Sequence, residues 1–472
     1  MDNFDKEQER EMRLQVNRYE RFLKGEDIWF DSDNYVDIID WYFNNDMFEQ
    51  AEEVTLRAYE LFPNNEEIIS RYTTYLANHS EYQKAIDITK QALDLYDSDE
   101  LRLDLASLYI DSNKNIDVAL DILLDILQRD EENYFIYMLI GRIFLERDNL
   151  INAEKYLHKA VELNYEDRMT LGCYTDCAFE PSLQDNIINL LFNLSREHPF
   201  MDIIWCALGI VYSRYKLFDL AIEAFDYAIV INPKGEIRHA CKADCLIAKK
   251  DYANAKKELD LAIDNAQNYA TDLHLVYAGI LIIENDYAKA LLHLKQVDDD
   301  ANDIFGKTYL LDMALCYYFL DDPSSAITCV QRAYDENIDI ELIIDFARKV
   351  YDYGFENHSE DIFEMLFTTS TDDYTIELAS TTLAALKSRD GHTFEAIKIM
   401  ENTLAELHSC TEDFWYAFLR ITCQDQKFDS YTTKTLKILS SLDSFPIYIK
   451  EHYPEIIDNP NYKRCLKQIH HV

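Results

Sequence analysis

Two pairs of cysteines are the residues of this sequence with the clearest capacity for chemistry. Cys173 and Cys177 stand four residues apart, and Cys241 and Cys245 repeat that spacing. Residues four apart lie on one face of a helix, so each pair could give two thiolates to a zinc ion or react with an oxidant. Cysteine also fills protein cores as a small hydrophobic residue. Structural packing is therefore the simpler interpretation, and we predict no metal.

One segment imitates the start of a calcium-binding loop. Asp298, Asp300 and Asn302 have the spacing of the first three ligands of such a loop. However, Asp303 stands where the loop needs a turn-forming glycine, and Tyr309 stands where it needs the last glutamate. We therefore predict a solvated acidic loop without a bound metal.

Other catalytic and cofactor-binding motifs are missing from the sequence. The nine glycines never stand close enough to form a phosphate-binding loop or a nucleophile elbow. The twelve histidines include no pair four residues apart, which a helical zinc protease site needs. Among 88 acidic residues, paired carboxylates arise from composition alone. We predict no catalytic residues and no cofactor, and hence no enzyme.

Charge and hydropathy limit the partners and the location. Asp and Glu number 88 against 45 Lys and Arg, and this net charge of −43 repels a phosphate backbone, so we expect no nucleic acid partner. The N-terminus is charged from its second residue, and the longest apolar run, residues 275–283, is too short to cross a bilayer. We therefore expect no membrane insertion and a cytoplasmic location.

The elements that would position any site are helices in a repeating order. Nine Gly and eight Pro are too few for the turns of a large β or α/β fold. A small residue recurs every 34 to 36 residues, and a second, mostly small one follows it after seven. We call the first of these the mark position. The mark residues are Ala51, Ala85, Ala119, Ala153, Ile187, Ala221, Ala255, Ala290, Ala326, Ile362 and Ala396.

The most complete copy of the repeat spans residues 203–233. Its spaced residues are Trp205, Leu208, Gly209, Tyr212, Phe218, Ala221, Phe225, Ala228 and Pro233. This pattern resembles the tetratricopeptide repeat, and the whole array resembles long bacterial proteins of that family. The resemblance implies an all-α fold, a right-handed superhelical α-solenoid of about eleven to twelve helix-turn-helix units.

Small residues should set the contact between the two helices of each repeat. At Gly209, Ala221 and Ala228 a larger side chain would push the backbones apart. The fifth and tenth repeats depart from this rule, because Ile187 and Ile362 occupy their mark positions. We expect altered packing in those two repeats.

The same period separates the two cysteine pairs. They stand 68 residues apart, which is two repeats, so they share one face of the fifth and seventh first helices. Stacked helices advance by about 10 Å, so the pairs should lie about 20 Å apart and cannot share one tetrahedral zinc.

The chain divides into three predicted parts. Residues 1–31 should form an N-terminal capping helix, residues 32–407 the tandem solenoid, and residues 408–472 a final helical pair with a capping segment. In the last part, Asn459 before Pro460 predicts the start of a short helix. The acidic stretch 297–306 predicts a flexible joint within the solenoid.

The resemblance also implies where a partner would bind. First helices line the concave surface in this family, and the side chains expected to face it in the fourth to seventh repeats are Phe135, Met138, Arg142, Met169, Asp176, Ile203, Cys206, Ile210, Ile237 and Asp244. The Lys and Asn residues with which some relatives grip acidic chaperone tails are missing at matching positions. A mixed apolar and acidic surface favours a protein or peptide segment with basic and apolar residues.

These patterns favour a non-catalytic interaction scaffold. One alternative is a regulatory receptor of the same architecture that responds to a peptide. Such receptors usually carry a DNA-binding segment in front of the repeats, whereas here a segment of about 30 residues with an excess of acidic over basic residues precedes the first repeat. The other alternative is an enzyme whose site has no recognisable motif.

Overall fold

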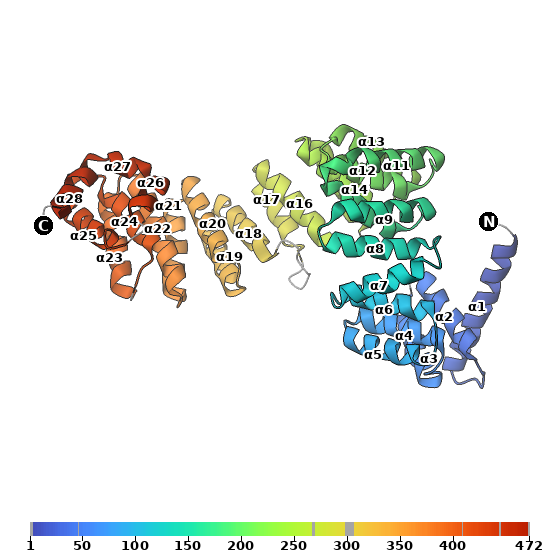
Figure 1. Cartoon of the computed structure of the whole chain (residues 1–472). Coiled ribbons are helices and arrows are strands. Elements are labelled where there is room, and N and C mark those ends of the chain that lie inside the picture. Colours follow the sequence, from blue (N-terminus) through green and yellow to red (C-terminus); the bar gives the residue numbers. More distant parts are fainter. Residues whose placement is uncertain are drawn as a thin grey trace. The chain divides into compact units, whose positions relative to one another are not determined.

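The chain is built from helices in two compact units. The computed structural model describes residues 3–45, 47–266, 270–297, 306–407, 409–442 and 445–470. Within these ranges it contains 28 α-helices, four short 3₁₀ turns and no strand (Figure 1), which confirms the predicted all-α class. Unit 1 is Met1–Asp251 and unit 2 is Tyr252–Val472. No helix in the described ranges is long and apolar enough to cross a bilayer.

Unit 1 contains fourteen helices, of which α2 to α13 are six consecutive pairs, and in all of these except α10 and α11 the two helices pack closely against each other. Their bounds are α1 Asn3–Leu23, α2 Ser32–Asn44, α3 Phe48–Leu61, α4 Glu66–Asn78, α5 Tyr82–Leu93, α6 Asp99–Asp111, α7 Ile116–Leu127, α8 Tyr134–Glu146, α9 Leu150–Leu163, α10 Arg168–Asp176, α11 Gln184–Glu197, α12 Asp202–Arg214, α13 Phe218–Ile231 and α14 Glu236–Ala248. Each even-numbered helix from α2 to α12 is the first helix of a repeat, and α14 is the first helix of the seventh.

Unit 2 continues the same pattern. Its helices are α15 Tyr252–Asn265, α16 Ala270–Ile283, α17 Tyr287–Leu294, α18 Tyr309–Phe319, α19 Pro323–Asp335, α20 Ile340–Asp352, α21 Glu356–Thr369, α22 Asp373–Arg389, α23 Thr393–Glu406, α24 Glu412–Thr422, α25 Asp429–Leu439, α26 Phe445–His452, α27 Pro454–Asp458 and α28 Pro460–His470. The predicted joint at residues 297–306 stays a prediction, because residues 298–305 lie outside the described ranges.

Capping side chains fix where the first helices begin. Asn65 accepts a hydrogen bond from the backbone N–H of Ile68, and Ser98, Asn133 and Asp167 cap α6, α8 and α10 in the same way. These side chains satisfy backbone donors that a helix leaves unpaired in its first turn. Each of these four caps therefore defines the residue at which its own helix begins.

Small residues set the contact within each helical pair, as predicted. All nine mark alanines are fully buried, namely Ala51, Ala85, Ala119, Ala153, Ala221, Ala255, Ala290, Ala326 and Ala396. A Cβ added to Gly209 would lie 2.7 Å from the ring of Phe225, and one added to Gly141 would overlap the side chain of Leu157. Only glycine therefore allows α8 and α12 to approach their partner helices this closely.

A left-handed backbone turns the chain between the two helices of most repeats. The turn position lies five residues before the mark. In six repeats it holds a residue other than glycine with φ between 54° and 62°, and in one repeat it holds Gly391 with φ of 89°. The six residues are Ser80, Asp148, Lys216, Lys250, Asn285 and Asp321. Asp148, Asn285 and Asp321 belong to the residue types that tolerate the left-handed region best after glycine, whereas Ser80, Lys216 and Lys250 do not.

The tenth repeat is regular, which corrects one sequence assignment. The mark is the fourth residue of second helices such as α13 and α19, and the fourth residue of α21 is Ser359 rather than Ile362. Ser359 is fully buried, and its hydroxyl donates to the carbonyl oxygen of Ala347 at 2.8 Å. Gly354, five places earlier, has φ of 88°, which matches the turn position.

The fifth repeat does depart from the regular pair. Its first helix, α10, has only nine residues and ends at Asp176. Two 3₁₀ turns, Cys177–Phe179 and Pro181–Leu183, then lead into α11. Ile187 is buried at the mark position where other repeats have alanine. A larger mark residue thus coincides with a shortened first helix.

Apolar side chains pack the terminal helices against the array. Tyr19 of α1 is buried and contacts the rings of Phe30 and Tyr35 at centroid distances of 5.7 and 6.0 Å. At the other end, the side chain of Asn459 accepts hydrogen bonds from the first turn of α28, including one of 2.8 Å from the N–H of Asn461. The predicted helix start at Asn459 and Pro460 is confirmed.

Candidate functional site

Four apolar side chains occupy one repeat position on four neighbouring first helices of unit 1. Phe135, Met169, Ile203 and Ile237 lie on α8, α10, α12 and α14, and each of these helices packs on the next. Phe135, Met169 and Ile237 are 36%, 57% and 54% exposed, and Ile203 is half-buried. We call these four residues the apolar row. Three of the four side chains are therefore exposed to solvent over more than a third of their surface.

The position three residues later forms the floor beside the apolar row. Its occupants on the same helices are Met138, Gly172, Cys206 and Ala240. A Cβ added to Gly172 would meet no atom within 4 Å, so the surface above α10 is open. Met138 is only 1% exposed and belongs to the hydrophobic core, so its predicted place on the binding surface is wrong. Its flexible side chain fills the interior below the floor.

The position seven residues after the apolar row carries mostly charged groups. Its occupants, Arg142, Asp176, Ile210 and Asp244, form what we call the polar row. Arg142 forms an ion pair of 2.9 Å with Asp111 on α6. Ile210 is half-buried. The polar row and the apolar row therefore flank the floor from either side.

One arginine neutralises the carboxylate of the short helix α10. The guanidinium of Arg214 pairs with Asp176 at 2.7 Å and lies 4.3 Å from the centre of the Phe179 ring. A cation over an aromatic face is attracted by the electron density of the ring. Asp176 is therefore paired within the protein, and Arg214 already balances its negative charge.

Two carboxylates near the floor form no ion pair among the described residues, although the charge of Arg71 acts on one of them, Asp104. Asp244 is open to solvent, yet surrounding protein raises its pKa by desolvation. Asp104 occupies the floor position on α6, and burial raises its pKa while one of its carboxylate oxygens has no hydrogen-bond partner. Arg142 and Arg214 are paired with carboxylates, whereas Asp244 is not. An approaching partner could therefore reach the carboxylate of Asp244 at the surface.

The cysteines of this face are free thiols. Cys206 and Cys241 are half-buried, and burial raises the pKa of the Cys241 thiol to about 12. Cys177 is fully buried, with a pKa also raised to about 12 by burial. No group of three His, Cys, Asp or Glu side chains in the described ranges could hold a metal ion. Thiols with raised pKa values are poor nucleophiles at neutral pH.

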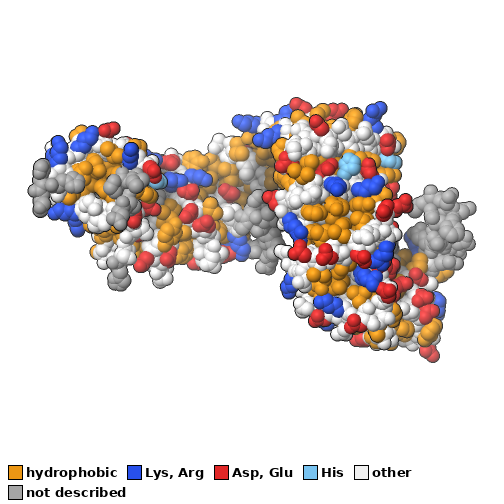
Figure 2. All heavy atoms as spheres, in the orientation of Figure 1, with side chains coloured by type: hydrophobic (Ala, Val, Ile, Leu, Met, Phe, Trp, Pro, Cys, Tyr) orange, Lys and Arg blue, Asp and Glu red, His pale blue; other side chains and the backbone are white. Residues whose placement is uncertain are grey.

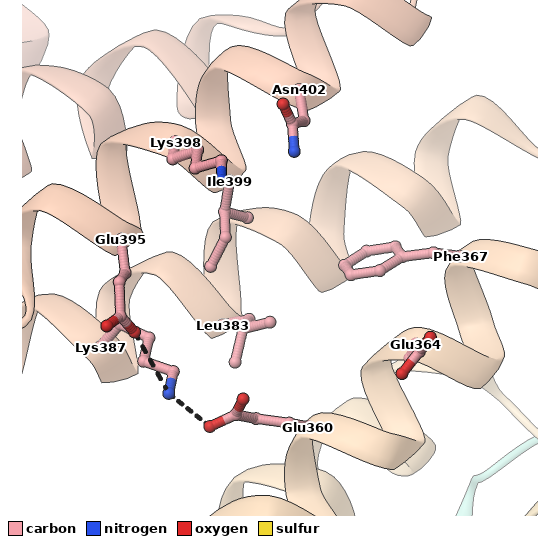
Figure 3. A pocket seen from close by; sticks show the side chains of 9 residues that line it. All are labelled: Glu360, Glu364, Phe367, Leu383, Lys387, Glu395, Lys398, Ile399 and Asn402. Atoms are coloured by element: carbon pink, nitrogen blue, oxygen red, sulfur yellow. Dashed lines mark hydrogen bonds and ion pairs between the residues drawn. The ribbon is translucent and has the colours of Figure 1, made fainter.

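A pocket of about 280 Å³ lies in unit 2 among α21, α22 and α23 (Figure 3). The ammonium of Lys387 forms an ion pair with Glu360 and lies 3.6 Å from the carboxylate of Glu395. The Lys387 side chain is only 13% exposed. Phe367, Leu383 and Ile399 give the pocket apolar walls. Sequence analysis missed this pocket, although one signal was present: Lys387 stands nine residues before the mark, where most repeats carry an apolar residue such as Phe144 or Tyr212.

Hydrophobic and charged side chains occupy different areas on one face of unit 1. Hydrophobic side chains gather over α8 and α9, with acidic and basic side chains around them (Figure 2).

The regular helical pairs, the 34-residue spacing of their buried alanines and the close contact at Gly209 together decide the fold. The fold is that of the tetratricopeptide-repeat proteins.

Comparison with solved structures finds proteins that share part of this architecture at low sequence identity. No family profile and no curated protein sequence matches it. A tetratricopeptide repeat protein from Parabacteroides merdae is 15% identical, with a TM-score of 0.37 over 60% of this chain and 98% of the other. Human IFIT1, solved as a dimer with m7Gppp-AAAA, is 13% identical, with a TM-score of 0.43 over 84% of this chain and 95% of the other. PilF of Pseudomonas aeruginosa is 18% identical, with a TM-score of 0.33 over 42% and 89%.

Proposed function

We propose that this tetratricopeptide-repeat chain is a non-catalytic binding protein that holds a segment of a protein partner on the first-helix face of unit 1. That face consists of the apolar row, the floor and the polar row. The observation that carries the proposal is the apolar row itself. Large apolar side chains that recur in phase on neighbouring helices and remain exposed are typical of an interaction site.

Electrostatics indicates the kind of segment that would bind. Arg142 and Arg214 are engaged by Asp111 and Asp176, whereas Asp104 and Asp244 form no ion pair among the described residues. A partner segment with Lys or Arg beside apolar residues complements this surface. Charge would steer the encounter and apolar contacts would hold the complex. A nucleic acid backbone would instead meet a chain of net charge −43.

The experiment is a selection of peptides on the full-length chain. Random twelve-residue peptides displayed on phage are selected against the purified protein, and the affinities of the recovered peptides are measured. We expect recovered peptides to combine apolar and basic residues. The double variant Met169→Glu, Ile237→Glu should weaken their binding at least tenfold, because it places two carboxylates in the apolar row.

A matched variant on another face controls for the effect of added charge. Ile151 on α9 is 62% exposed and lies outside the apolar row, so Ile151→Glu should leave the affinities unchanged. The circular dichroism of all variants should show the same helix content. Peptides that bind the double variant as well as they bind the unmodified chain, or the recovery of no peptide at all, would contradict the proposal.

A further inference from the structure

The pocket of unit 2 has the size of a small ligand. It lies among α21, α22 and α23, and its volume is about 280 Å³ (Figure 3). Pockets that hold drug-sized molecules enclose about 300–1,000 Å³, so this one suits a molecule of fewer atoms. All of its lining residues belong to unit 2, so it is separate from the first-helix face of unit 1.

Apolar side chains form the base of the pocket. Leu383 of α22 is buried in the hydrophobic core of unit 2, and Phe367 of α21 and Ile399 of α23 are half-buried and pack against that core. Side chains packed in this way keep a fixed position. The base therefore offers a firm apolar surface to a hydrocarbon chain.

One side of the pocket carries two carboxylates. Glu360 and Glu364 stand four residues apart on α21, so they lie on the same face of that helix and repel each other. We call these two residues the acidic wall. Lys387 forms an ion pair with Glu360, whereas Glu364 is exposed and forms no ion pair among the described residues. The uncompensated charge of Glu364 favours an ammonium group on the ligand.

Another side of the pocket carries hydrogen-bond donors. Lys398 and Asn402 stand four residues apart on one face of α23, and we call them the donor wall. Both are exposed, and neither side chain has a hydrogen-bond or ion-pair partner in the part of the chain that the structure describes. An ammonium and an amide N–H group together suit a carboxylate.

The two walls face each other across the apolar base. Figure 3 shows the acidic wall and the donor wall on opposite sides of Leu383 and Ile399. The walls belong to different helices, α21 and α23, and both of these helices pack on α22. A ligand that reaches both walls must therefore carry its ammonium and its carboxylate at separate ends of an apolar body.

Ligands with charges of one sign fit the pocket less well. A phosphate or another anion would meet three carboxylates, and two of them, Glu360 and Glu395, already engage the ammonium of Lys387. A diamine would place its second ammonium beside Lys398, where like charges repel.

We propose that this pocket binds a small zwitterion, an ω-amino acid whose ammonium and carboxylate groups stand at the two ends of a hydrocarbon chain. The ammonium lies at the acidic wall, the carboxylate lies at the donor wall, and the chain lies on the apolar base. This site is independent of the peptide-binding face proposed for unit 1.

Four small probes test the arrangement of charges: 6-aminohexanoate, leucine, hexylamine and hexanoate. 6-Aminohexanoate and leucine are isomers, but leucine carries both charged groups on one carbon. Their affinities for the full-length chain are measured by ligand-observed nuclear magnetic resonance. We expect 6-aminohexanoate to bind about tenfold more tightly than each other probe, because it alone contacts both walls. Equal affinity for leucine, or no binding of 6-aminohexanoate, would overturn the inference.

Two single variants assign the two ends of the ligand. Glu364→Gln should weaken binding of 6-aminohexanoate and of hexylamine by about tenfold, because both present an ammonium to the acidic wall. Lys398→Gln should weaken 6-aminohexanoate by about tenfold and should not weaken hexylamine, which has no carboxylate. If neither variant changes the affinity for 6-aminohexanoate, the ligand binds elsewhere and the inference is wrong.

Matched variants outside the pocket control for the change in net charge. Glu406 on α23 and Lys434 on α25 are exposed and do not line the pocket, so Glu406→Gln and Lys434→Gln should leave every affinity unchanged. All variants should keep the same helix content by circular dichroism. The double variant Met169→Glu, Ile237→Glu should bind 6-aminohexanoate normally, so the two proposals can fail separately. Loss of 6-aminohexanoate binding in any of these control variants would overturn the assignment to this pocket.

Discussion

Gly209 of α12 lies so close to Phe225 of α13 that a single added methyl group would come within 2.7 Å of the aromatic ring. The ring is fully buried. Glycine is the only residue that this contact accommodates, because neither the ring nor the helix backbone has room to move.

Gly209→Ala should therefore lower the free energy of unfolding of this part of unit 1. Overpacked cores lose about 1–3 kcal/mol, and this exceeds the gain of about 1 kcal/mol that alanine gives in a helix. The measurement is hydrogen exchange of the α12 and α13 amides, which reports local unfolding. Gly172→Ala is the control, since it faces open space and should slow exchange in α10.

Lys216 should be replaceable with a gain in stability. It has φ of 59° in the turn between α12 and α13, and its side chain is exposed. The left-handed region costs a residue with a Cβ about 1–2 kcal/mol, so Lys216→Gly should raise the free energy of unfolding by about 1 kcal/mol after the entropy cost of glycine. Chemical denaturation checks this.

The reverse change serves as the control for the turn position. Gly391 has φ of 89° at the equivalent place in unit 2. Gly391→Ala should lower stability by a similar amount. If Lys216→Gly has no effect while Gly391→Ala is destabilising, the cost at Lys216 is offset by interactions of its side chain.

His158 should stabilise helix α9 at low pH. Its ring lies 3.4 Å from Glu154 and 3.6 Å from Glu162, and its Nδ1 is 3.0 Å from the hydroxyl of Tyr174. The hydrogen bond to Glu154 raises the pKa of His158 above its usual 6.5. This stabilisation is complete below pH 6.5 and disappears as the pH rises through the pKa of the folded protein.

Nuclear magnetic resonance titration of the His158 ring measures that pKa directly. Glu154→Gln should bring it down toward 6.5, because the main cause of the shift is removed. Glu162 contributes less, so Glu162→Gln should have a smaller effect. A His158 pKa at or below 6.5 in the unmodified chain would contradict the assignment.

His274 and His293 should show the opposite behaviour. Their Nδ1 atoms are 2.9 Å apart, so one ring donates and the other accepts, and Tyr277 stacks on His293 at 4.1 Å. Burial lowers the pKa of both rings, and the charge of His293 lowers that of His274 further. As the pH falls below 6.5, the unfolded chain takes up protons more readily, and the α16–α17 contact loses stability.

Local hydrogen exchange in α16 and α17 at pH 7.5 and 5.5 tests this prediction once intrinsic exchange rates are divided out. Exchange protection should decrease at the lower pH. In the variant His274→Gln, His293→Gln the change should disappear, because neither position can take up a proton. Equal protection at both pH values in the unmodified chain would contradict it.

Much of the fold could be predicted from the sequence, because the signals are local and repeat in phase. Gly209 and the mark alanines are small where two backbones meet, and no other explanation accounts for their spacing. Ser359 was missed because its hydroxyl is satisfied by Ala347 and a serine then packs like an alanine. The long helix α22, with 17 residues, then returned the next mark, Ala396, to its expected position. This concealed that the tenth mark is Ser359 and not Ile362.

The candidate site was less predictable than the fold. The period places Phe135, Met169 and Ile237 on one face, but burial depends on neighbouring helices. Met138 shares its repeat position with Gly172 and yet is buried, because its long side chain can bend into the core. The ion pair of Asp176 with Arg214, 38 residues later, has no sequence signal.

The shortened helix α10 gives the first-helix face a built-in reporter of occupancy. A nine-residue helix with glycine at its centre and 3₁₀ turns after it opens more readily than the 13-residue helices α8 and α12 beside it. Its amides should exchange fastest among the first helices of unit 1. A segment laid across the floor would therefore slow exchange most at α10, where the free protein has the least protection to begin with.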